Sequence, residues 1–171
     1  MQLNYIANAC VPSSSGKTIP VIDPSDGQVF DELQRSNAAD IDTAVTAARD
    51  CFDLVWQHIP AAERGRLLMR LSNKITEHAD ELALLEQRDC GKLVKQARAD
   101  AALARYFEFY AGACDKLHGD TLPYLNGYSV MTWREPHGVS GHIIPWNYPM
   151  QIFGRSVGGA LAAGLNCRLA G

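Results

Sequence analysis

The spacing of apolar side chains divides the chain into three regions with different predicted structure. In residues 1–36, short apolar runs are separated by Pro, Asp and Gly, and the segments Val21-Ile22 and Val29-Phe30 flank one such turn. This arrangement predicts a strand pair. Residues 37–118 carry apolar side chains at helical spacing, and later residues first alternate with a period of two. The pattern therefore predicts strands, then a helical layer, then strands again.

The helical layer is predicted as three helices. Ser36 or Asn37 caps a first helix that runs to about residue 52. Pro60 suits the first position of the second, and a stripe over residues 82–89 extends the pattern to a stop at Gly91. The third is expected from about residue 93 to 117. The second helix has an apolar face formed by Leu67, Leu68, Leu71 and Ile75. The third has a face of mainly small residues, formed by Ala97, Ala101, Ala104, Tyr110 and Ala111.

The last region predicts a hairpin followed by a strand and a helix. Asn126-Gly127 is a strong hairpin signal, and the alternation over residues 128–135 predicts a strand after it. Residues 138–144 predict a buried strand that ends at the turn 145–149. Pro149 can begin a helix from Met150 to about residue 163, whose glycines would press against a sheet. Strand, turn and helix form the opening of a βα unit, so the fold class is α/β.

Composition and charge exclude several classes of protein. The chain is 47% hydrophobic with a net charge of −3, which argues against disorder and against binding to nucleic acid or an anionic membrane. No apolar run approaches the length of a membrane span, and the N-terminus lacks the pattern of a signal peptide. Five widely spaced cysteines, with no C-x-x-C pair, favour free thiols in the cytoplasm.

Most short motifs favour ordinary structural roles. The segment from Ser15 to Thr18 resembles the end of a phosphate-binding loop, but Val11 stands where that motif needs glycine, so a surface turn is expected. No G-x-G-x-x-G motif is present. The five histidines show no zinc-ligand spacing, so we expect no metal site.

Asn147 is the strongest candidate for chemistry. It lies in the turn between the predicted strand and helix, where ligands of α/β sheets bind. A fixed amide donor beside a helix N-terminus suits a developing oxyanion. From the residues alone, a plain turn residue remains the alternative.

Several segments in order resemble the NAD(P)-dependent aldehyde dehydrogenase superfamily. The segment from Ile143 to Pro149 is similar to its proline–tryptophan–asparagine segment. The resemblance extends to about Cys167. The other matching segments are Ile22-Asp23-Pro24, Ala62 to Leu68, Asp89-Cys90-Gly91-Lys92, Tyr110 to Pro123, and Arg134-Glu135-Pro136 with Gly138-Val139.

The resemblance implies an activity and a set of site residues. Family members oxidise an aldehyde to a carboxylic acid with NAD or NADP, using a cysteine nucleophile and a glutamate base. It implies that Asn147 is the catalytic oxyanion donor. Ile143, Ile144, Pro145 and Trp146 would line the cofactor cleft. Strands over residues 121–135 would form a homo-oligomer.

The departures from the family are as informative as the matches. The chain contains neither Gly-Gln-x-Cys nor Glu-x-Gly-Gly, the settings of the family's nucleophile and base, and it reads Leu165 to Gly171 where the family has a lysine–proline pair. We therefore expect an inactive N-terminal portion, ended by truncation or frameshift. Its three parts would be a hairpin and helices (1–120), oligomerisation strands (121–136) and the start of an incomplete Rossmann-like unit (137–171). A non-catalytic module that associates with full-length homologues, or a small nucleotide-binding domain, are the alternatives.

Overall fold

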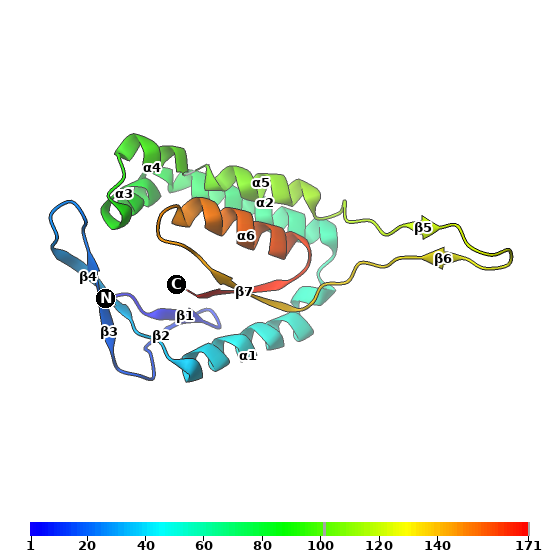
Figure 1. Ribbon diagram of the computed structural model, residues 1–171, viewed down its shortest axis with the longest axis horizontal. Coiled ribbons are helices and arrows are strands. Elements are labelled where there is room, and N and C mark those ends of the chain that lie inside the picture. The colour runs from blue at the N-terminus through cyan, green and yellow to red at the C-terminus, as the bar shows by residue number, and fades with distance from the viewer. Residues whose placement is uncertain (101, 171) are drawn as a thin grey trace.

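Helices on both sides of a short parallel strand pair make up most of the molecule, and a thin two-stranded ribbon projects from it (Figure 1). The computed structural model describes residues 1–100 and 102–170, with side chains described except at 99, 100 and 166–170. The predicted α/β class is confirmed. In chain order, the elements are β1 (Asn4–Ile6), β2 (Ala9–Val11), β3 (Thr18–Ile22), β4 (Val29–Gln34), α1 (Ala38–Leu54), the 3₁₀ turn η1 (Trp56–His58), α2 (Ala61–Glu77), α3 (Ala79–Cys90), α4 (Val94–Asp100), α5 (Leu103–Ala113), β5 (Thr121–Leu122), β6 (Val130–Met131), β7 (Val139–Ile143), α6 (Pro149–Ala162) and β8 (Asn166–Ala170).

The N-terminal strands form two antiparallel pairs, β1 with β2 and β3 with β4. The turn between β3 and β4 contains Gly27 at φ 73°, a left-handed conformation that glycine adopts without steric cost. The predicted strand pair around this turn is confirmed. The segment that resembled a phosphate loop is an exposed turn leading into β3, as predicted.

A buried carboxylate fixes the start of α1. Asn37 caps the helix by accepting from the N–H groups of Ala39 and Asp40, and Asp40 accepts in return from the N–H of Asn37. Asp40 also accepts from the Ser13 hydroxyl at 2.7 Å and the Ser14 N–H at 2.8 Å. These hydrogen bonds hold the pKa of Asp40 far below its ordinary value, and they join the N-terminal strands to α1.

Helix α2 packs against α5, and both contact α6; we call these three helices the helical body. Pro60 is the N-cap of α2 and not its first helical residue, a small correction that follows from its extended backbone at ψ 148°. The predicted apolar stripe of α2 is only partly buried: Leu68 and Ile75 are 2% and 8% exposed, Leu67 is half-buried, and Leu71 is 37% exposed. The core cluster consists of Leu68, Ile75, Leu103, Phe107, Cys114 and Ala162.

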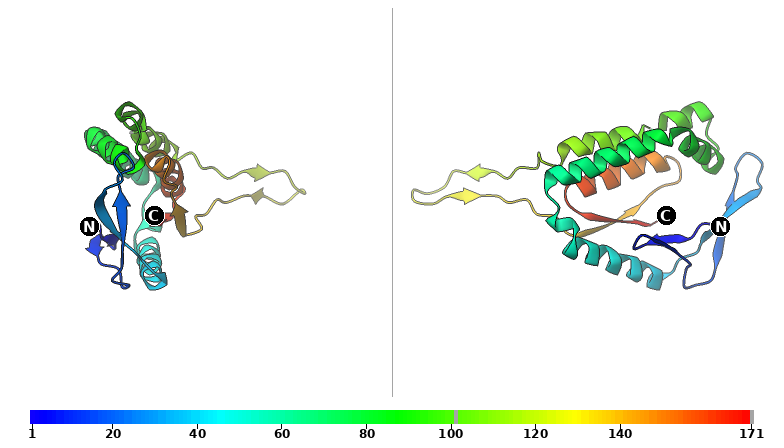
Figure 2. Two further views of the ribbon diagram at one scale, coloured as in Figure 1. Left: turned by 60° about the vertical axis from the view of Figure 1, so that its left-hand side comes forward. Right: turned by 180° about the vertical axis from the view of Figure 1, so that it is seen from behind.

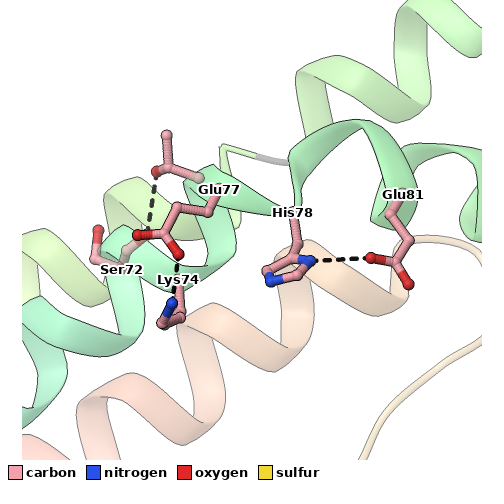
Figure 3. A network of polar contacts seen from close by, with 6 residues as sticks. Ser72, Lys74, Glu77, His78 and Glu81 are labelled. Atoms are coloured by element: carbon pink, nitrogen blue, oxygen red, sulfur yellow. Dashed lines mark hydrogen bonds and ion pairs between the residues drawn. The ribbon is translucent and has the colours of Figure 1, made fainter.

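The junction of α2 and α3 carries a group of exposed polar contacts (Figure 3). His78 ends α2 by donating its N–H to the Lys74 carbonyl and directly precedes α3. Its ring contacts Glu81 at 2.9 Å, and Lys74 pairs with Glu77 at 2.5 Å, which lowers the pKa of Glu77. Pairs this exposed add little stability. The predicted second helix is thus two helices divided at His78, and α3 ends at the predicted stop, Gly91, with φ 69°.

The expected long third helix is instead two helices, α4 and α5, and the second ends at Ala113 rather than near residue 117. Small-residue spacing fits either arrangement, so the periodicity could not reveal the division. Ala97 is fully buried, while Ala104 and Ala111 pack against the core cluster. The expected contribution of Ala101 lies outside the described residues.

The glycines of α6 contact a helix, not a sheet as the sequence predicted. A side chain at Gly154 would lie 2.9 Å from Leu103 Cδ1, and one at Gly158 would lie 2.7 Å from the Tyr110 ring. Both partners belong to α5. Small-residue spacing permits close approach by any neighbour, and here that neighbour is α5.

Strand β7 pairs in parallel with β8, from Val139 opposite Asn166 to Ile143 opposite Ala170. Helix α1 covers one face of this pair and α6 the other, as the opposite views in Figures 1 and 2 show. One prediction needs correction: the sequence predicts that the strand over residues 138–144 is buried, but Ile143 at the end of β7 is 86% exposed.

Strands β5 and β6 form a ribbon, residues 119–135, that extends away from all other elements (Figures 1 and 2). The turn at its tip has Asn126-Gly127 at its centre, closed by a hydrogen bond from the Tyr128 N–H to the Leu125 carbonyl. The hairpin is confirmed. Pairing covers only two residues on each side, however, so most of the expected strand over residues 128–135 is irregular. In the part of the chain that the structure describes, no helix is long and apolar enough to cross a membrane.

Candidate functional site

The five candidate site residues lie at the carboxyl end of β7, where the chain turns into α6. Ile143 ends the strand, Ile144 and Pro145 follow it, and Trp146 and Asn147 form the turn. Tyr148 caps α6, and Pro149 is its first residue. Because β7 and β8 are parallel, this end of the pair is the edge at which ligands bind in open α/β sheets.

Asn147 is exposed, and its side chain makes no hydrogen bond to any group that the structure describes. Its NH₂ group is thus a free donor in the residue before the N-cap of α6. The unsatisfied N–H groups at this helix end add partial positive charge. Together they provide a place where a developing negative charge on a small molecule would be stabilised.

The apolar candidates divide between exposed and half-buried positions. Ile143 and Trp146 are 86% and 79% exposed, which is unusual for large apolar side chains, while Ile144 is half-buried. Exposed apolar groups at a sheet edge are typical of a binding surface. The segment therefore combines an apolar surface with the amide donor of Asn147.

A histidine inside β7 joins the strand to α6. The His142 ring contacts the Ser140 hydroxyl at 2.9 Å through Nε2, and its Nδ1 contacts the Ser156 hydroxyl. Ser156 lies in the middle of α6. The Nδ1 contact joins the strand to the helix and the Nε2 contact lies within β7, so the ring fixes the direction in which the chain enters the turn.

Two residues at the end of α3, which the sequence did not indicate as part of the site, hold this turn from the other side. The Cys90 thiol at the end of α3 donates to the Trp146 carbonyl at 2.9 Å. The Lys92 ammonium lies 4.1 Å from the centre of the Tyr148 ring and pairs with Glu86. The segment Asp89-Cys90-Gly91-Lys92 carried a family resemblance, but nothing in the sequence indicated that it contacts a turn more than fifty residues later.

The left-handed conformation of Gly91 reverses the chain immediately after α3, which places Lys92 against Glu86 of that helix. A side chain at Gly91 would also lie 2.9 Å from Pro24. Glycine is required here for both reasons.

Burial chiefly, and then the charges of Asp89 and Glu86, raise the pKa of Cys90 to about 11, although Lys92 opposes the effect. The thiol therefore keeps its proton at neutral pH and remains a donor. A thiol with this pKa is a poor nucleophile, so Cys90 contributes structure to the turn rather than reactivity. Among the described residues, no group of three His, Cys, Asp or Glu side chains could hold a metal ion.

Comparisons with known proteins agree on one family. Residues 10–169 match the aldehyde dehydrogenase family. A solved Burkholderia cenocepacia protein assigned to the aldehyde dehydrogenases is 63% identical, with a TM-score of 0.96 over 98% of this chain and 35% of its own. A betaine aldehyde dehydrogenase variant from Staphylococcus aureus, solved with NAD⁺, is 30% identical, with a TM-score of 0.93 over 98% of this chain and 35% of its own.

A curated relative extends the similarity to a plant protein. The mitochondrial aldehyde dehydrogenase family 2 member B4 of Arabidopsis thaliana is 46% identical over 90% of this chain and 29% of its own length. The chain thus spans about a third of the proteins it matches, and the whole turn 143–149 lies inside the matched region.

Proposed function

Because this chain belongs to the aldehyde dehydrogenase family, we propose that it supplies the N-terminal portion of an enzyme that oxidises an aldehyde to a carboxylic acid with NAD or NADP. The observation that carries the proposal is the free amide of Asn147 at the carboxyl end of a parallel strand pair. The absence of both catalytic motifs from the sequence supports a chain that is inactive by itself.

In this proposal, Asn147 acts on the carbonyl oxygen of the aldehyde. Its N–H group donates to that oxygen as negative charge develops during nucleophilic attack, and the N-terminus of α6 adds electrostatic support. A neutral amide cannot be deprotonated at physiological pH, so the donor is available throughout. A fixed donor needs no reorganisation at the moment of reaction, and this is the physical source of its effect.

The same turn fits a nicotinamide cofactor. Exposed Ile143 and Trp146, together with Ile144 and Pro145, offer an apolar surface and backbone groups beside a sheet edge. We propose that these four residues hold the cofactor. When bound, NAD(P)⁺ supplies the hydride acceptor. The chain's own contribution is to shield that acceptor from water and to hold it beside the Asn147 donor.

We also propose that the chain forms a homo-oligomer through the ribbon. In this proposal the chain has three parts: a hairpin and helices (1–120), oligomerisation strands (121–136) and the start of the Rossmann-like unit (137–171). The ribbon exposes Tyr124, Leu125, Tyr128 and Trp133, each at least 65%. This exposure also favours the alternative of a non-catalytic module that associates with full-length homologues through the same strands. The free cysteines support a reducing compartment such as the cytoplasm.

A chimera tests the catalytic proposal. Residues 1–165 of this chain would replace the matching segment of the 63% identical Burkholderia cenocepacia protein. We expect NAD(P)H formation with small aldehydes, and a fall in kcat of about 10²–10³ in the Asn147→Ala chimera. Asn73→Ala, at an exposed position of α2, is the matched control. Unchanged kcat in a folded Asn147→Ala chimera would show that Asn147 is only a turn residue and not a catalytic donor.

The isolated chain tests the inactive-portion proposal. With NAD or NADP and a panel of aldehydes, it should form no NAD(P)H above background. Turnover that follows the protein through purification would contradict the proposal.

A further inference from the structure

The C-terminal end of α3 contacts the residue on each side of Asn147. Cys90 holds the Trp146 carbonyl, and Lys92 lies over the Tyr148 ring. Glu86 pairs with Lys92 from inside α3. We propose that Glu86, Cys90 and Lys92, together the α3 anchor, are positioning residues that fix the turn presenting the Asn147 amide. This inference rests on the proposed function for its catalytic meaning, while the contacts themselves stand independently.

The ion pair within the α3 anchor is rigid because it is buried. The side chain of Glu86 is 2% exposed and that of Lys92 is 12% exposed. Charges with so little access to water interact more strongly and are screened less than surface pairs. Glu86 therefore restrains the Lys92 ammonium to one location, and Lys92 is not a mobile surface cation.

The restrained ammonium in turn fixes an aromatic ring. Its distance of 4.1 Å from the centre of the Tyr148 ring is well within the range of a cation–π interaction. Tyr148 directly follows Asn147 and is the N-cap of α6. The contact therefore acts one residue from the proposed donor, at the point where the turn becomes helical.

The Cys90 thiol restrains the chain on the other side of Asn147, at Trp146. A hydrogen bond of 2.9 Å from Cys90 to the Trp146 carbonyl restrains the peptide that precedes Asn147. The raised pKa of Cys90 keeps this donor protonated at neutral pH. An S–H group is a weak donor, so we expect this contact to contribute less than the Lys92 contact.

The distribution of contacts matches a positioning role. Both neighbours of Asn147 are held, whereas its own exposed amide makes no hydrogen bond to any described group. The α3 anchor therefore restrains the turn on each side of this amide and leaves the amide itself unoccupied. A catalytic donor needs a fixed backbone and an unoccupied side chain, because small misplacements reduce rates sharply.

Chymotryptic cleavage of the 171-residue chain tests the contacts. Trp146 and Trp133 are 79% and 80% exposed, so cleavage after each depends mainly on local backbone mobility. We expect Lys92→Met, which removes both the cation–π contact and the buried partner of Glu86, to accelerate cleavage after Trp146 at least about tenfold and to leave cleavage after Trp133 unchanged. Lys92→Arg keeps both interactions and should restore the original rate.

Controls separate positioning from general stability. Lys95→Met removes an exposed lysine of α4 and should change neither rate. Cys90→Ala should accelerate cleavage after Trp146 by a smaller factor, and Cys90→Ser, which restores a donor, should reverse the change. Equal acceleration at both tryptophans, or no change in the Lys92→Met chain, would overturn the proposal.

The chimera distinguishes this inference from the proposed function. We expect Lys92→Met to lower kcat about tenfold with little change in KM, and Lys92→Arg to recover it. If Asn147→Ala lowers kcat but Lys92→Met leaves it unchanged, the positioning role is wrong and the proposed function stands. If Asn147→Ala has no effect, the proposed function fails, and the positioning role that rests on it fails as well.

Discussion

The helical body and the ribbon both contain aromatic side chains, but in opposite environments. Phe107 in α5 is fully buried and packs against Phe153 of α6 with ring centres 5.8 Å apart. In the ribbon, Trp133 is 80% exposed, and the ring centres of Tyr124 and Tyr128 lie 5.9 Å apart. Aromatic character alone therefore does not decide burial. Each helix of the body packs against the other two, whereas the ribbon extends away from the other elements that the structure describes (Figure 1).

This difference indicates which apolar surface stabilises the chain and which is available for partners. Burial in the body contributes to the free energy of folding, because those side chains leave water when α2, α5 and α6 assemble. The ribbon side chains remain in water in the isolated chain. We therefore expect mutations in the two regions to act on different measurements, stability for the body and association for the ribbon.

The sharpest test compares two phenylalanines of α5. Phe107→Ala removes a fully buried ring and should lower the free energy of unfolding by about 3–5 kcal/mol. Phe109→Ala removes a ring that is 64% exposed and should cost less than about 1 kcal/mol. Urea denaturation followed by circular dichroism measures both. Similar losses for the two variants would show that the body does not form its core as described.

A second test concerns the contact between α2 and α5. A methyl group at Gly65 would lie 2.7 Å from the Ala111 carbonyl oxygen, so Gly65→Ala must separate the two helices at a cost of about 1–3 kcal/mol. Gly112→Ala is the matched control, since nothing lies within 4 Å of its added methyl group. That variant should be neutral or stabilising by a few tenths to about 1 kcal/mol. A stable Gly65→Ala chain would mean that α2 and α5 are farther apart.

The labelling rates of the thiols measure how often the helical body opens, and they require no substitution that lowers the stability of the chain. Burial raises the pKa of Cys114, which is 3% exposed in the core cluster, whereas Cys51 is exposed on α1. Iodoacetamide should modify Cys51 first and Cys114 only through opening of the body, as mass spectrometry can follow. Because the folded thiol favours its proton, the stability that it contributes is present below the unfolded pKa of about 8.5 and is lost as pH rises above it. Equal labelling rates would contradict a closed core.

The smallest effect on stability is expected in the ribbon. Trp133→Ser should change the free energy of unfolding by no more than about 0.5 kcal/mol. The same change should reduce binding of a hydrophobic dye and weaken self-association in sedimentation velocity, because it removes the most exposed ribbon aromatic. A loss of stability comparable to that of Phe107→Ala would place the ribbon in the folding core.

Local chemistry explains what the sequence could predict. The N-cap at Asn37, the stop at Gly91 and the start of α6 at Pro149 each depend on one residue and its immediate neighbours, and all three are confirmed. The turn that carries Asn147 was predicted in the same way. These features need no knowledge of distant partners.

Features that depend on distant partners were missed. The glycines of α6 indicated close packing but not that α5 is the neighbour. The contacts of Cys90 and Lys92 with Trp146 and Tyr148 join segments far apart in the chain, and a single sequence carries no signal for them. The division between α4 and α5 was missed because small residues give no strong periodicity.

The position of α1 has a consequence for the order in which the chain folds. Helix α1 lies early in the sequence, yet it packs on β7 and β8, which come near the opposite end. Those contacts close a very long loop, and closing it costs conformational entropy before any packing is gained. The helical body requires shorter closures and can assemble first, with α1 docking only after the parallel strands have paired. We therefore expect α1, the first helix in the sequence, to dock last.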